Sequence, residues 1–336
     1  MSGTSDKHLT CLDFESFQAQ EASQSESHLS KCRPDEAENP HQSLKNSQSK
    51  GLNKRHASPT TERAGKIIKG SPKGFGLPQV IEHADTRRAL IVRNESPWDT
   101  FQKHFSCQLL AGTVIIAAHR SRPTKVIAIR EYPAEIAEKM LQCFHHIQHE
   151  NILSATECYR DRDSLYTVVD DIPLTLEHLN SSRNLCPTQL QLGSILKQVL
   201  DGLSYLVANG FEHRSLTCSN TLLALDGSIK IAGLESCIES PQSKSQTLSI
   251  KAIATMTMDL MQTYEKDNGV VGVDDLDLWP VDSDAFSFLS TTSSAGSIEA
   301  LKQHPLINRP PRHRGQLVCL ARLAIISART FYSLEL

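Results

Sequence analysis

The residues with the clearest chemical potential lie in one short polar segment. Between Phe211 and Cys237 the chain reads FEHRSLTCSNTLLALDGSIKIAGLESC, which has the rhythm of a catalytic loop followed by a two-stranded hairpin. The segment carries His213, Arg214 and Asn220, of which we interpret His213 and Arg214 as structural rather than catalytic. No carboxylate stands between them, and a serine hydroxyl cannot replace a carboxylate as a general base. The segment therefore raises the question of whether a reaction takes place here.

Three other patterns suggest chemistry elsewhere in the chain. Cys143, His146 and His149 follow one another at three-residue spacing, as zinc ligands on a helix do, but no fourth ligand is indicated, so we favour a helix end with exposed histidines. SILK (residues 194–197) fits the S-x-x-K pattern of serine acyl-enzymes without either companion motif, so we interpret it as part of a core helix. Cys218 lies within the polar segment, and we interpret it as a buried, inert thiol rather than a reactive one.

Strand and helix patterns that could position the polar segment precede it. FSCQLLA and TVIIAAHR predict two strands around Gly112, and KVIAIREY predicts a third that is apolar and β-branched. Pro133 suits the first turn of a helix through AEIAEKMLQCFHHIQ. SATECYR and SLYTVVDD then predict two more strands. The first ordered part is therefore expected to contain five strands and one helix.

Helical patterns dominate the chain after the fifth strand. In PTQLQLGSILKQVLDGLSYLVANG, apolar residues recur every three or four positions, which predicts an amphipathic core helix that stops at Asn209-Gly210. TLLALDGSIKIAG predicts a hairpin with Asp226-Gly227 at its turn. SIKAIATMTMDLMQTY predicts a buried helix, and SIEALKQHPLI and GQLVCLARLAIISARTFYSL predict helices that close the chain.

Composition changes sharply along the chain. Residues 1–75 are rich in Ser, Gln, Lys, Asn and His and cannot bury enough apolar surface to offset chain entropy. We expect a disordered tail there, followed by a linker over residues 76–97. The end of the tail, KGLNKRHASPTTERAGKIIKGSPK, is basic and is either a nuclear-import or anionic-surface patch or a solvated linker, and we favour the linker.

The whole-chain composition excludes several classes of protein. A net charge of −3 gives no reason to expect a nucleic-acid partner. Nine cysteines without a C-x-x-C pair indicate free thiols in a reducing compartment. The first residues contain no apolar signal segment, and no apolar run has the length of a membrane span. We therefore expect a soluble protein of the cytoplasm or nucleus whose partner is neither a membrane nor a nucleic acid.

Five short motifs occur in the order of one well-known family. They are IAIR (127–130) in the third strand, HENIL (149–153) after the helix, LYTVVDD (165–171) in the fifth strand, HRSLTCSN (213–220) in the polar segment and SIEALKQHPLI (297–307) near the end. Together they resemble a eukaryotic protein kinase domain over residues 98–308. The resemblance implies a bilobal α+β fold, with a five-stranded N-lobe and one helix (98–172), a mainly helical C-lobe (173–308) and a C-terminal helical extension (309–336).

The resemblance also assigns roles, and most of the charged residues that phosphoryl transfer needs are replaced. Arg130 stands where a lysine grips the α- and β-phosphates of ATP, and Met140 stands where a glutamate pairs with that lysine. Ser215 replaces the aspartate that accepts the substrate proton, and Thr217 replaces the lysine two residues further on. Gly233 replaces the aspartate that bridges magnesium to the phosphates.

Other parts of the family's nucleotide site are reduced as well. Asn220 is retained as the ligand for a second magnesium ion, but we do not expect magnesium to bind without the lost aspartate. Glu235 lies two residues from the lost aspartate and is not expected to substitute for it. QLLAGTVIIA contains one glycine where the family uses three to close over phosphates. The segment after Glu235 has no A-P-E motif, and Ser249 replaces an aspartate that braces the catalytic loop.

A purine pocket could survive these losses. By the resemblance, Ala128 and Leu222 would line the adenine site, Val169 would be the gatekeeper, and Asp170 to Ile172 would form the hinge. Apolar walls and hinge backbone groups could then bind ATP without a metal ion. The alternative is that these residues pack the core between the lobes.

Three hypotheses for the function remain open. The leading one is a pseudokinase, a kinase-fold protein without catalysis that scaffolds or allosterically regulates a protein partner, such as an active kinase. The second is a divergent Ser/Thr kinase that transfers phosphate from ATP to protein hydroxyls with Arg130, Asn220 and Glu235. The third is a decayed sequence whose C-lobe folds poorly. The departures also resemble those of degenerate kinase-like proteins of filamentous fungi, which suggests a source but no function.

Overall fold

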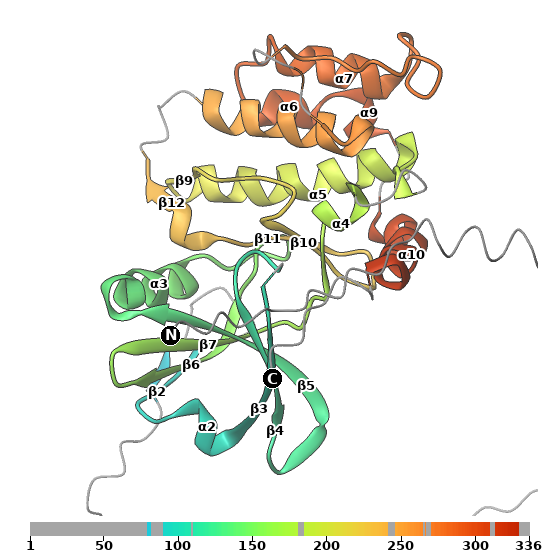
Figure 1. The fold of residues 1–336 in the computed structure, drawn as a ribbon. Helices are drawn as coiled ribbons and strands as arrows, with labels where there is room; N and C mark the ends of the chain where they lie inside the picture. The colour runs from blue at the N-terminus through green and yellow to red at the C-terminus, as the bar shows by residue number, and fades with distance from the viewer. Residues whose placement is uncertain are drawn as a thin grey trace, which may run out of the picture. The chain divides into compact units, whose positions relative to one another are not determined.

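The computed structural model describes residues 79–81, 90–108, 110–180, 185–240, 246–264, 266, 270–309 and 313–328. The predicted tail, residues 1–75, lies outside the described residues. Within the unit formed by residues 71–336, a β-sheet and a group of helices make two lobes (Figure 1). The bilobal α+β architecture expected from the sequence is confirmed.

The N-lobe is a seven-stranded sheet with the order β1-β2-β6-β7-β5-β4-β3. Its strands are β1 (Gln79–Ile81), β2 (Leu90–Arg93), β3 (Phe101–Cys107), β4 (Val114–His119), β5 (Arg122–Pro133), β6 (Ala155–Asp161) and β7 (Ser164–Val169). Neighbouring strands are antiparallel, except β2 and β6, which run parallel. Strands β3 to β7 are the five that the sequence predicts.

Two additional strands lie where the sequence predicts only a linker. β1 and β2 fall within residues 76–97, so the ordered lobe begins before residue 98. Leu90 and Val92 are buried while the positions between and after them are partly exposed, which is the alternation of a strand with one covered face. β2 pairs with β1 on one side and with β6 on the other, where Tyr159 lies opposite Arg93. A pairing this distant in the chain leaves no local sequence pattern.

Two helices accompany the sheet. The short α2 (Pro97–Thr100) precedes β3, and α3 (Ala134–His146) follows β5 directly, with Pro133 as its N-cap. The inward face of α3 buries Met140 and Phe144 completely or nearly so, at 0% and 1% exposure. This helix therefore forms part of the core between the sheet and the C-lobe.

The C-lobe is built around α5 (Gln189–Ala208), the long helix that the apolar periodicity predicts. Thr188 caps it in a capping box with Gln191, and it ends before Gly210, whose φ of 78° favours glycine. The other described helices are α4 (Glu177–Asn180), α6 (Thr247–Gln262), α7 (Asp284–Thr292), α8 (Ile298–Lys302), α9 (Pro305–Asn308) and α10 (Val318–Ala328), with 3₁₀ turns η2 (Leu234–Ser236) and η4 (Arg314–Leu317). Across the described part of the chain, we find no helix with both the length and the apolar character of a membrane span.

Short strands attach the polar segment to the C-lobe. They are β8 (Leu174–Thr175), β9 (Phe211–His213), β10 (Thr221–Leu223), β11 (Ile229–Ile231) and β12 (Cys237–Glu239). β9 pairs with β12, while β10 lies between β8 and β11. The predicted hairpin is confirmed, because β10 and β11 are antiparallel and Gly227 at their turn has a φ of 82°.

The segment after α3 fastens the two lobes together. The amide of Leu153 donates to the carbonyl of Ile231 at 2.8 Å, and the amide of Ile231 donates to the carbonyl of Asn151 at 2.9 Å. The side chain of Asn151, which is 4% exposed, donates to the Ile229 carbonyl at 3.0 Å. The HENIL motif therefore joins the N-lobe to β11, which leads into the polar segment.

Candidate functional site

The polar loop between β9 and β10 is held by its own hydrogen bonds. The buried ring of His213 donates from Nε2 to the carbonyl of Ala232 at 2.9 Å and accepts at Nδ1 from the amide of Ser215 at 3.3 Å. Asn220 donates from Nδ2 to the Ser215 carbonyl at 2.5 Å, and the Ala232 amide donates to the Asn220 carbonyl at 2.8 Å. The loop is thus tied to the residue before Gly233 and keeps a defined shape without a carboxylate.

The environment of His213 suits a neutral ring. Burial lowers the pKa of His213 below its ordinary value, while the carbonyl of Ala232 and the charge of Glu235 act in the opposite direction. A neutral imidazole can donate from one nitrogen and accept at the other, as the two hydrogen bonds of this ring require. His213 therefore serves as a structural bridge inside the loop.

The positions that the resemblance assigns to acids carry none. Gly233 has a φ of 77°, and a Cβ built on it would lie 3.5 Å from both Asn220 Cγ and His213 Nε2. A carboxylate here would therefore face the retained Asn220, as a pair of magnesium ligands must. Ser215 places its hydroxyl 3.4 Å from Asn220 Nδ2, and Thr217 takes part in the hydrogen bonds of the loop itself. The frame of the loop is present, but its negative charges are absent.

Arg130, on β5, holds the turn that connects β3 to β4. Its guanidinium donates from Nη1 to the carbonyl of Ala111 at 2.6 Å and from Nη2 to the carbonyl of Leu110 at 2.5 Å. Only 6% of Arg130 is exposed, and Leu110 and Ala111 are buried as well. Two charge-assisted bonds from one planar fork fix this turn in a single geometry. We call this arrangement the Arg130 clamp.

Surrounding packing, and not local preference, maintains the clamp. Ala111 has a φ of 56°, which is uncommon for a residue with a side chain. The buried Nε of Arg130 has no hydrogen-bond partner among the described residues. Burial lowers the pKa of Arg130, while Tyr132 and Glu235 act in the opposite direction. The turn therefore tolerates both backbone strain and a partly unsatisfied buried charge.

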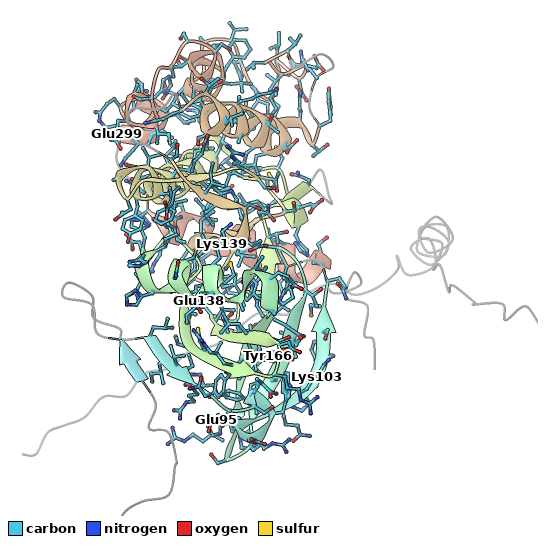
Figure 2. The ribbon with its side chains drawn as sticks, turned by 90° about the vertical axis from the view of Figure 1, so that its left-hand side faces the viewer. Glu95, Lys103, Glu138, Lys139, Tyr166 and Glu299 are labelled. Carbon is cyan, nitrogen blue, oxygen red and sulfur yellow. The ribbon has the colours of Figure 1, made fainter. Side chains whose placement is uncertain are left out.

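No acid of α3 pairs with Arg130 among the contacts of the described residues. Met140, at the position of the family's glutamate, is fully buried in the core. Glu138 instead forms an ion pair with Arg160 at 2.8 Å, and its neighbour Lys139 donates to the carbonyl of Glu235 at 2.6 Å. Figure 2 shows Glu138 and Lys139 on the helix between the sheet and the C-lobe. The ion pair of the family is thus replaced by a contact between α3 and η2.

The residues predicted for a purine pocket are mostly buried together. Ala128, Val169, Ile172 and Leu222 belong to the same continuous apolar core as Leu110 of the clamped turn. Asp170, by contrast, places its carboxylate 3.5 Å from the Nζ of Lys230. The structure therefore brings the apolar members of the predicted site into one cluster, whereas the Asp170 carboxylate is paired with Lys230.

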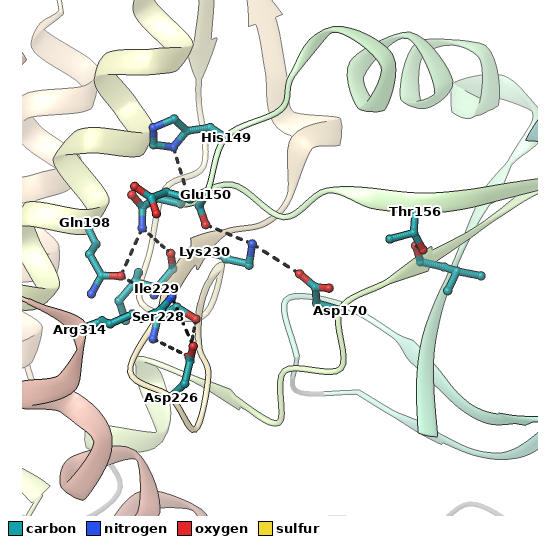
Figure 3. A network of polar contacts seen from close by, with 12 residues as sticks. His149, Glu150, Thr156, Asp170, Gln198, Asp226, Ser228, Ile229, Lys230 and Arg314 are labelled. Atoms are coloured by element: carbon teal, nitrogen blue, oxygen red, sulfur yellow. Dashed lines mark hydrogen bonds and ion pairs between the residues drawn. The ribbon is translucent and has the colours of Figure 1, made fainter. Parts of the chain in front are cut away.

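A polar pocket of about 380 Å³ lies beside the hinge, and Figure 3 shows its polar contacts. Asp170 and Asp171 line it together with residues of the β10–β11 hairpin, and Arg314 contributes from η4. Both cations in its wall are paired, Lys230 with Asp170 and Arg314 with Asp226, each at 3.5 Å. Sequence reasoning missed this pocket because its walls come from several separate segments of the chain.

The rival sites of the sequence are involved in structural contacts. His149 stacks on Tyr205 with 4.9 Å between ring centroids, and Lys197 pairs with Asp201 at 3.0 Å. Cys218 is buried, and burial raises the pKa of its thiol well above the ordinary value. In the described ranges, no group of three or more His, Cys, Asp or Glu side chains is arranged to hold a metal ion.

The clamp itself is the feature that sequence reasoning missed. Arg130 and Leu110 are 20 residues apart in the chain, one on β5 and the other in the turn between β3 and β4. Two signals were present in the sequence: an arginine at a lysine position, and apolar residues where the family has a glycine-rich turn. An apolar turn next to a buried cation will bury its side chains and offer its carbonyls to that cation.

The two lobes, the HENIL junction and the loop between β9 and β10 together define a protein kinase fold. A family model described as "Protein kinase domain" matches residues 111–259. Over this region the chain therefore matches the eukaryotic protein kinase family.

Curated relatives of the chain are Ser/Thr kinases. It is 25% identical to the Aurora/IPL1-related protein kinase 2 of Caenorhabditis briggsae over 152 residues (45% of this chain, 48% of that protein). It is 30% identical over 106 residues to the serine/threonine-protein kinase PLK4 of Drosophila grimshawi (30% of this chain, 14% of that protein). It is 32% identical over 109 residues to the cyclin-dependent kinase 12 of Caenorhabditis elegans (29% of this chain, 15% of that protein). The chain spans about half or less of the length of these relatives.

Proposed function

We propose that this protein is a pseudokinase, a kinase-fold module that acts by binding a protein partner instead of transferring phosphate. The observation that carries the proposal is the Arg130 clamp. The cation that would grip the phosphates donates both of its terminal nitrogens to carbonyls of its own chain, those of Leu110 and Ala111. A triphosphate would have to break both bonds before it could reach Arg130.

The residues present do not fit magnesium and ATP. Protein kinase domains bind ATP in general, and they hold its phosphates through a lysine and metal ions. Here the phosphate-gripping position is committed to the clamp, Gly233 offers no metal ligand, and Ser215 offers no base. Each of these roles contributes orders of magnitude to the rate, so their combined loss is not compensated by one retained residue such as Asn220.

A purine without metal remains compatible with the apolar residues near the hinge. Ala128, Val169 and Leu222 offer an apolar lining of the kind that adenine prefers. Leu110 belongs to the same core, which favours the alternative that these residues pack against one another. These residues therefore contribute first to the stability of the domain, and binding of a purine is their secondary role.

The second candidate is a divergent Ser/Thr kinase. Two observations favour it: Asn220 keeps a fixed position beside Gly233, and the charge of Glu235 stabilises the charged form of Arg130. In that reading, Glu235 would move to hold the metal that Gly233 cannot hold. Its exposed side chain makes this movement sterically simple, but its carbonyl is held by Lys139.

The partner of the proposed pseudokinase is another protein, with an active kinase as one case, in the cytoplasm or nucleus. A scaffold of this kind needs a stable fold and an accessible surface, and neither depends on the lost acids. The third hypothesis, a poorly folding C-lobe, is disfavoured by α5, whose inward leucines are fully buried.

A phosphotransfer assay tests the proposal. Purified full-length protein is incubated with γ-labelled ATP, magnesium or manganese, and a generic basic protein substrate, alongside Arg130→Ala and the exposed control Arg120→Ala. We expect the three proteins to give the same background. Metal-dependent transfer that is present in the wild type and in Arg120→Ala but lost in Arg130→Ala would overturn the proposal and support the divergent kinase.

A further inference from the structure

Exposed apolar side chains are concentrated between α6 and α7. Eleven large apolar side chains are exposed among the described residues, and five of them fall within residues 264–281. Three of the five, Leu276, Leu278 and Val281, are 47%, 53% and 60% exposed and stand within six residues of one another. Single exposed leucines are ordinary in proteins, whereas a local group of them indicates a contact surface. We call residues 274–282 the acidic–apolar loop.

The acidic–apolar loop is anchored to the C-lobe beneath it. Trp279 is 3% exposed and donates its indole N–H to the carbonyl of Met261 at 2.9 Å. Asp275 accepts from the amide of Leu278 at 2.9 Å through its side chain and from the amide of Trp279 at 3.0 Å through its carbonyl. A loop fixed in this way presents its exposed side chains in one arrangement. Binding of a partner would therefore cost little entropy for ordering the loop.

The charged residues within the loop and up to the start of α7 all have one sign. Residues 274–284 contain five aspartates and no lysine, arginine or histidine. Asp274 is paired with Lys266 at 2.5 Å, and Asp284 is paired with Arg309 at 2.6 Å. Asp277 and Asp282 are exposed and have no ion pair or side-chain hydrogen bond with any described residue. Two carboxylates without a partner in the described part of the chain therefore flank Leu278 and Val281.

This charge excludes several kinds of occupant. The phosphates of nucleic acids and of anionic membrane surfaces would be repelled by the aspartates. A second copy of the same surface would place aspartates opposite aspartates, which is unfavourable in a two-fold contact. The remaining class is a protein segment that carries apolar side chains together with lysine or arginine.

We propose that the acidic–apolar loop is a docking surface for a basic, amphipathic segment of a partner protein. Apolar side chains of the partner would cover Leu276, Leu278 and Val281, and its cations would approach Asp277 and Asp282. The inference rests on the proposed function, because it gives the chemistry of the partner of a non-catalytic module. Figure 1 shows α6 and α7, which the loop connects, at the end of the C-lobe away from the sheet, so docking there leaves the Arg130 clamp untouched.

Two labelled peptides and three double variants of the full-length protein test this inference. Both peptides have about 14 residues, roughly four helical turns, with leucines on one face and either lysines or glutamates on the other. Binding is followed by fluorescence anisotropy without nucleotide. The variants are Leu278→Ser/Val281→Ser and Asp277→Lys/Asp282→Lys in the loop, and Leu323→Ser/Ile326→Ser as the matched control. The control removes two side chains of similar exposure, 50% and 60%, from α10.

The inference predicts saturable binding of the lysine peptide and at least about tenfold weaker binding of the glutamate peptide. Each loop variant should weaken binding of the lysine peptide by about tenfold or more, while the α10 control stays within about twofold. Equal losses in all three variants, unchanged binding in the loop variants, or no saturable binding by the wild type would each overturn the inference. The peptide-binding experiment contains no nucleotide, so its outcome does not depend on phosphotransfer. A positive phosphotransfer assay would therefore overturn the proposed function without deciding whether the loop binds the lysine peptide.

Discussion

Two regions that a kinase directs at one nucleotide have changed in opposite ways in this protein. The loop between β9 and β10 has lost its acids but keeps a network of neutral hydrogen bonds, such as those of His213 and Asn220. The turn between β3 and β4 keeps a cation beside it, but that cation now bonds the turn itself. One region has lost charge without losing shape, and the other has kept charge and changed its use.

Under the proposed function, the difference indicates which interactions a kinase fold needs when it serves as a scaffold. Backbone carbonyls and a neutral histidine support the polar loop without a side-chain charge at Ser215 or Gly233. In the turn, the described side-chain hydrogen bonds are one between Thr113 and Gln108 at 2.8 Å and the two from Arg130, which bind its backbone carbonyls. We therefore expect the turn to be sensitive to a single substitution and the polar loop to be more tolerant.

The largest effect is expected for Arg130→Ala, which breaks the clamp. The substitution removes two charge-assisted bonds and leaves the buried carbonyls of Leu110 and Ala111 unpaired. We expect the free energy of unfolding to fall by about 2–4 kcal/mol, measured by urea denaturation. Arg130→Lys keeps the positive charge but not the planar pair of donors, and it should lower the free energy of unfolding by about half as much.

The control for the clamp is Arg120→Ala, at an exposed arginine that donates to the carbonyl of Trp98. It should change the free energy of unfolding by about 0.5 kcal/mol or less. If Arg130→Ala were as mild as this control, the turn would be held by its packing alone, and the contrast between the two regions would disappear.

Acid should weaken the polar loop and spare the clamp. His213 has a folded pKa below the value of 6.5 of an unperturbed histidine, so the unfolded chain takes up a proton that the folded chain resists. Stability is therefore full above about pH 6.5 and declines as the pH falls below it, by at most about 1.4 kcal/mol per pH unit for this residue. Arg130 keeps its charge over the same range.

Urea denaturation at about pH 7.5 and about pH 5.5 measures this loss. His213→Gln should show a smaller pH dependence than the wild type, whereas His104→Gln, at an exposed position, should show the same dependence as the wild type. A His213→Gln variant with an unchanged slope would assign the acid sensitivity to other groups.

Asn220→Ala should have a moderate effect on the polar loop. Asn220 Nδ2 donates to the Ser215 carbonyl at 2.5 Å in a half-buried setting, and the loss of one such bond costs about 1 kcal/mol. The melting transition should remain cooperative, because the backbone bond between Ala232 and Asn220 persists. A loss above about 3 kcal/mol would show that the loop depends on one side chain, as the clamped turn does.

The smallest effect is expected for Lys139→Ala, between α3 and η2. Lys139 donates to the carbonyl of Glu235 at 2.6 Å, but the side chain is exposed and competes with water for this bond. We expect a change of about 0.5 kcal/mol or less in the urea denaturation of the variant. A larger loss would mean that this exposed contact between α3 and η2 is a main tie between the lobes, beside the HENIL junction.

Local sequence patterns predicted much of the fold, but they did not predict strand pairings between segments that are far apart in the chain. The leucines of α5 and the turn at Asp226-Gly227 follow rules that act over a few residues, and both features are present. β2 is four residues long and gains its stability from β6, far along the chain, so the linker prediction for residues 76–97 missed it. Short strands of this kind are specified by their partners more than by their own residues.

In the candidate site, too, local motifs were predicted from the sequence and contacts between distant segments were not. The replaced acid at Ser215 could be read from the spacing of the HRSLTCSN motif, and the one at Gly233 from its place directly after the predicted hairpin, because both segments keep the residue order of the family. The bond from Arg130 to Leu110 could not, because it depends on how the turn between β3 and β4 folds onto β5. The position of Asp170 beside Lys230 also depends on two segments that only the folded chain brings together.

A thermal-shift titration of the full-length protein with ATP, with and without magnesium, tests the central claim most directly. A ligand that binds only the folded state stabilises it by about 2.7 kcal/mol at a concentration of one hundred times its Kd, so binding must raise the melting temperature. The Arg130 clamp and the missing acids predict no rise that depends on magnesium. A clear magnesium-dependent rise would contradict the account and return the divergent kinase to first place.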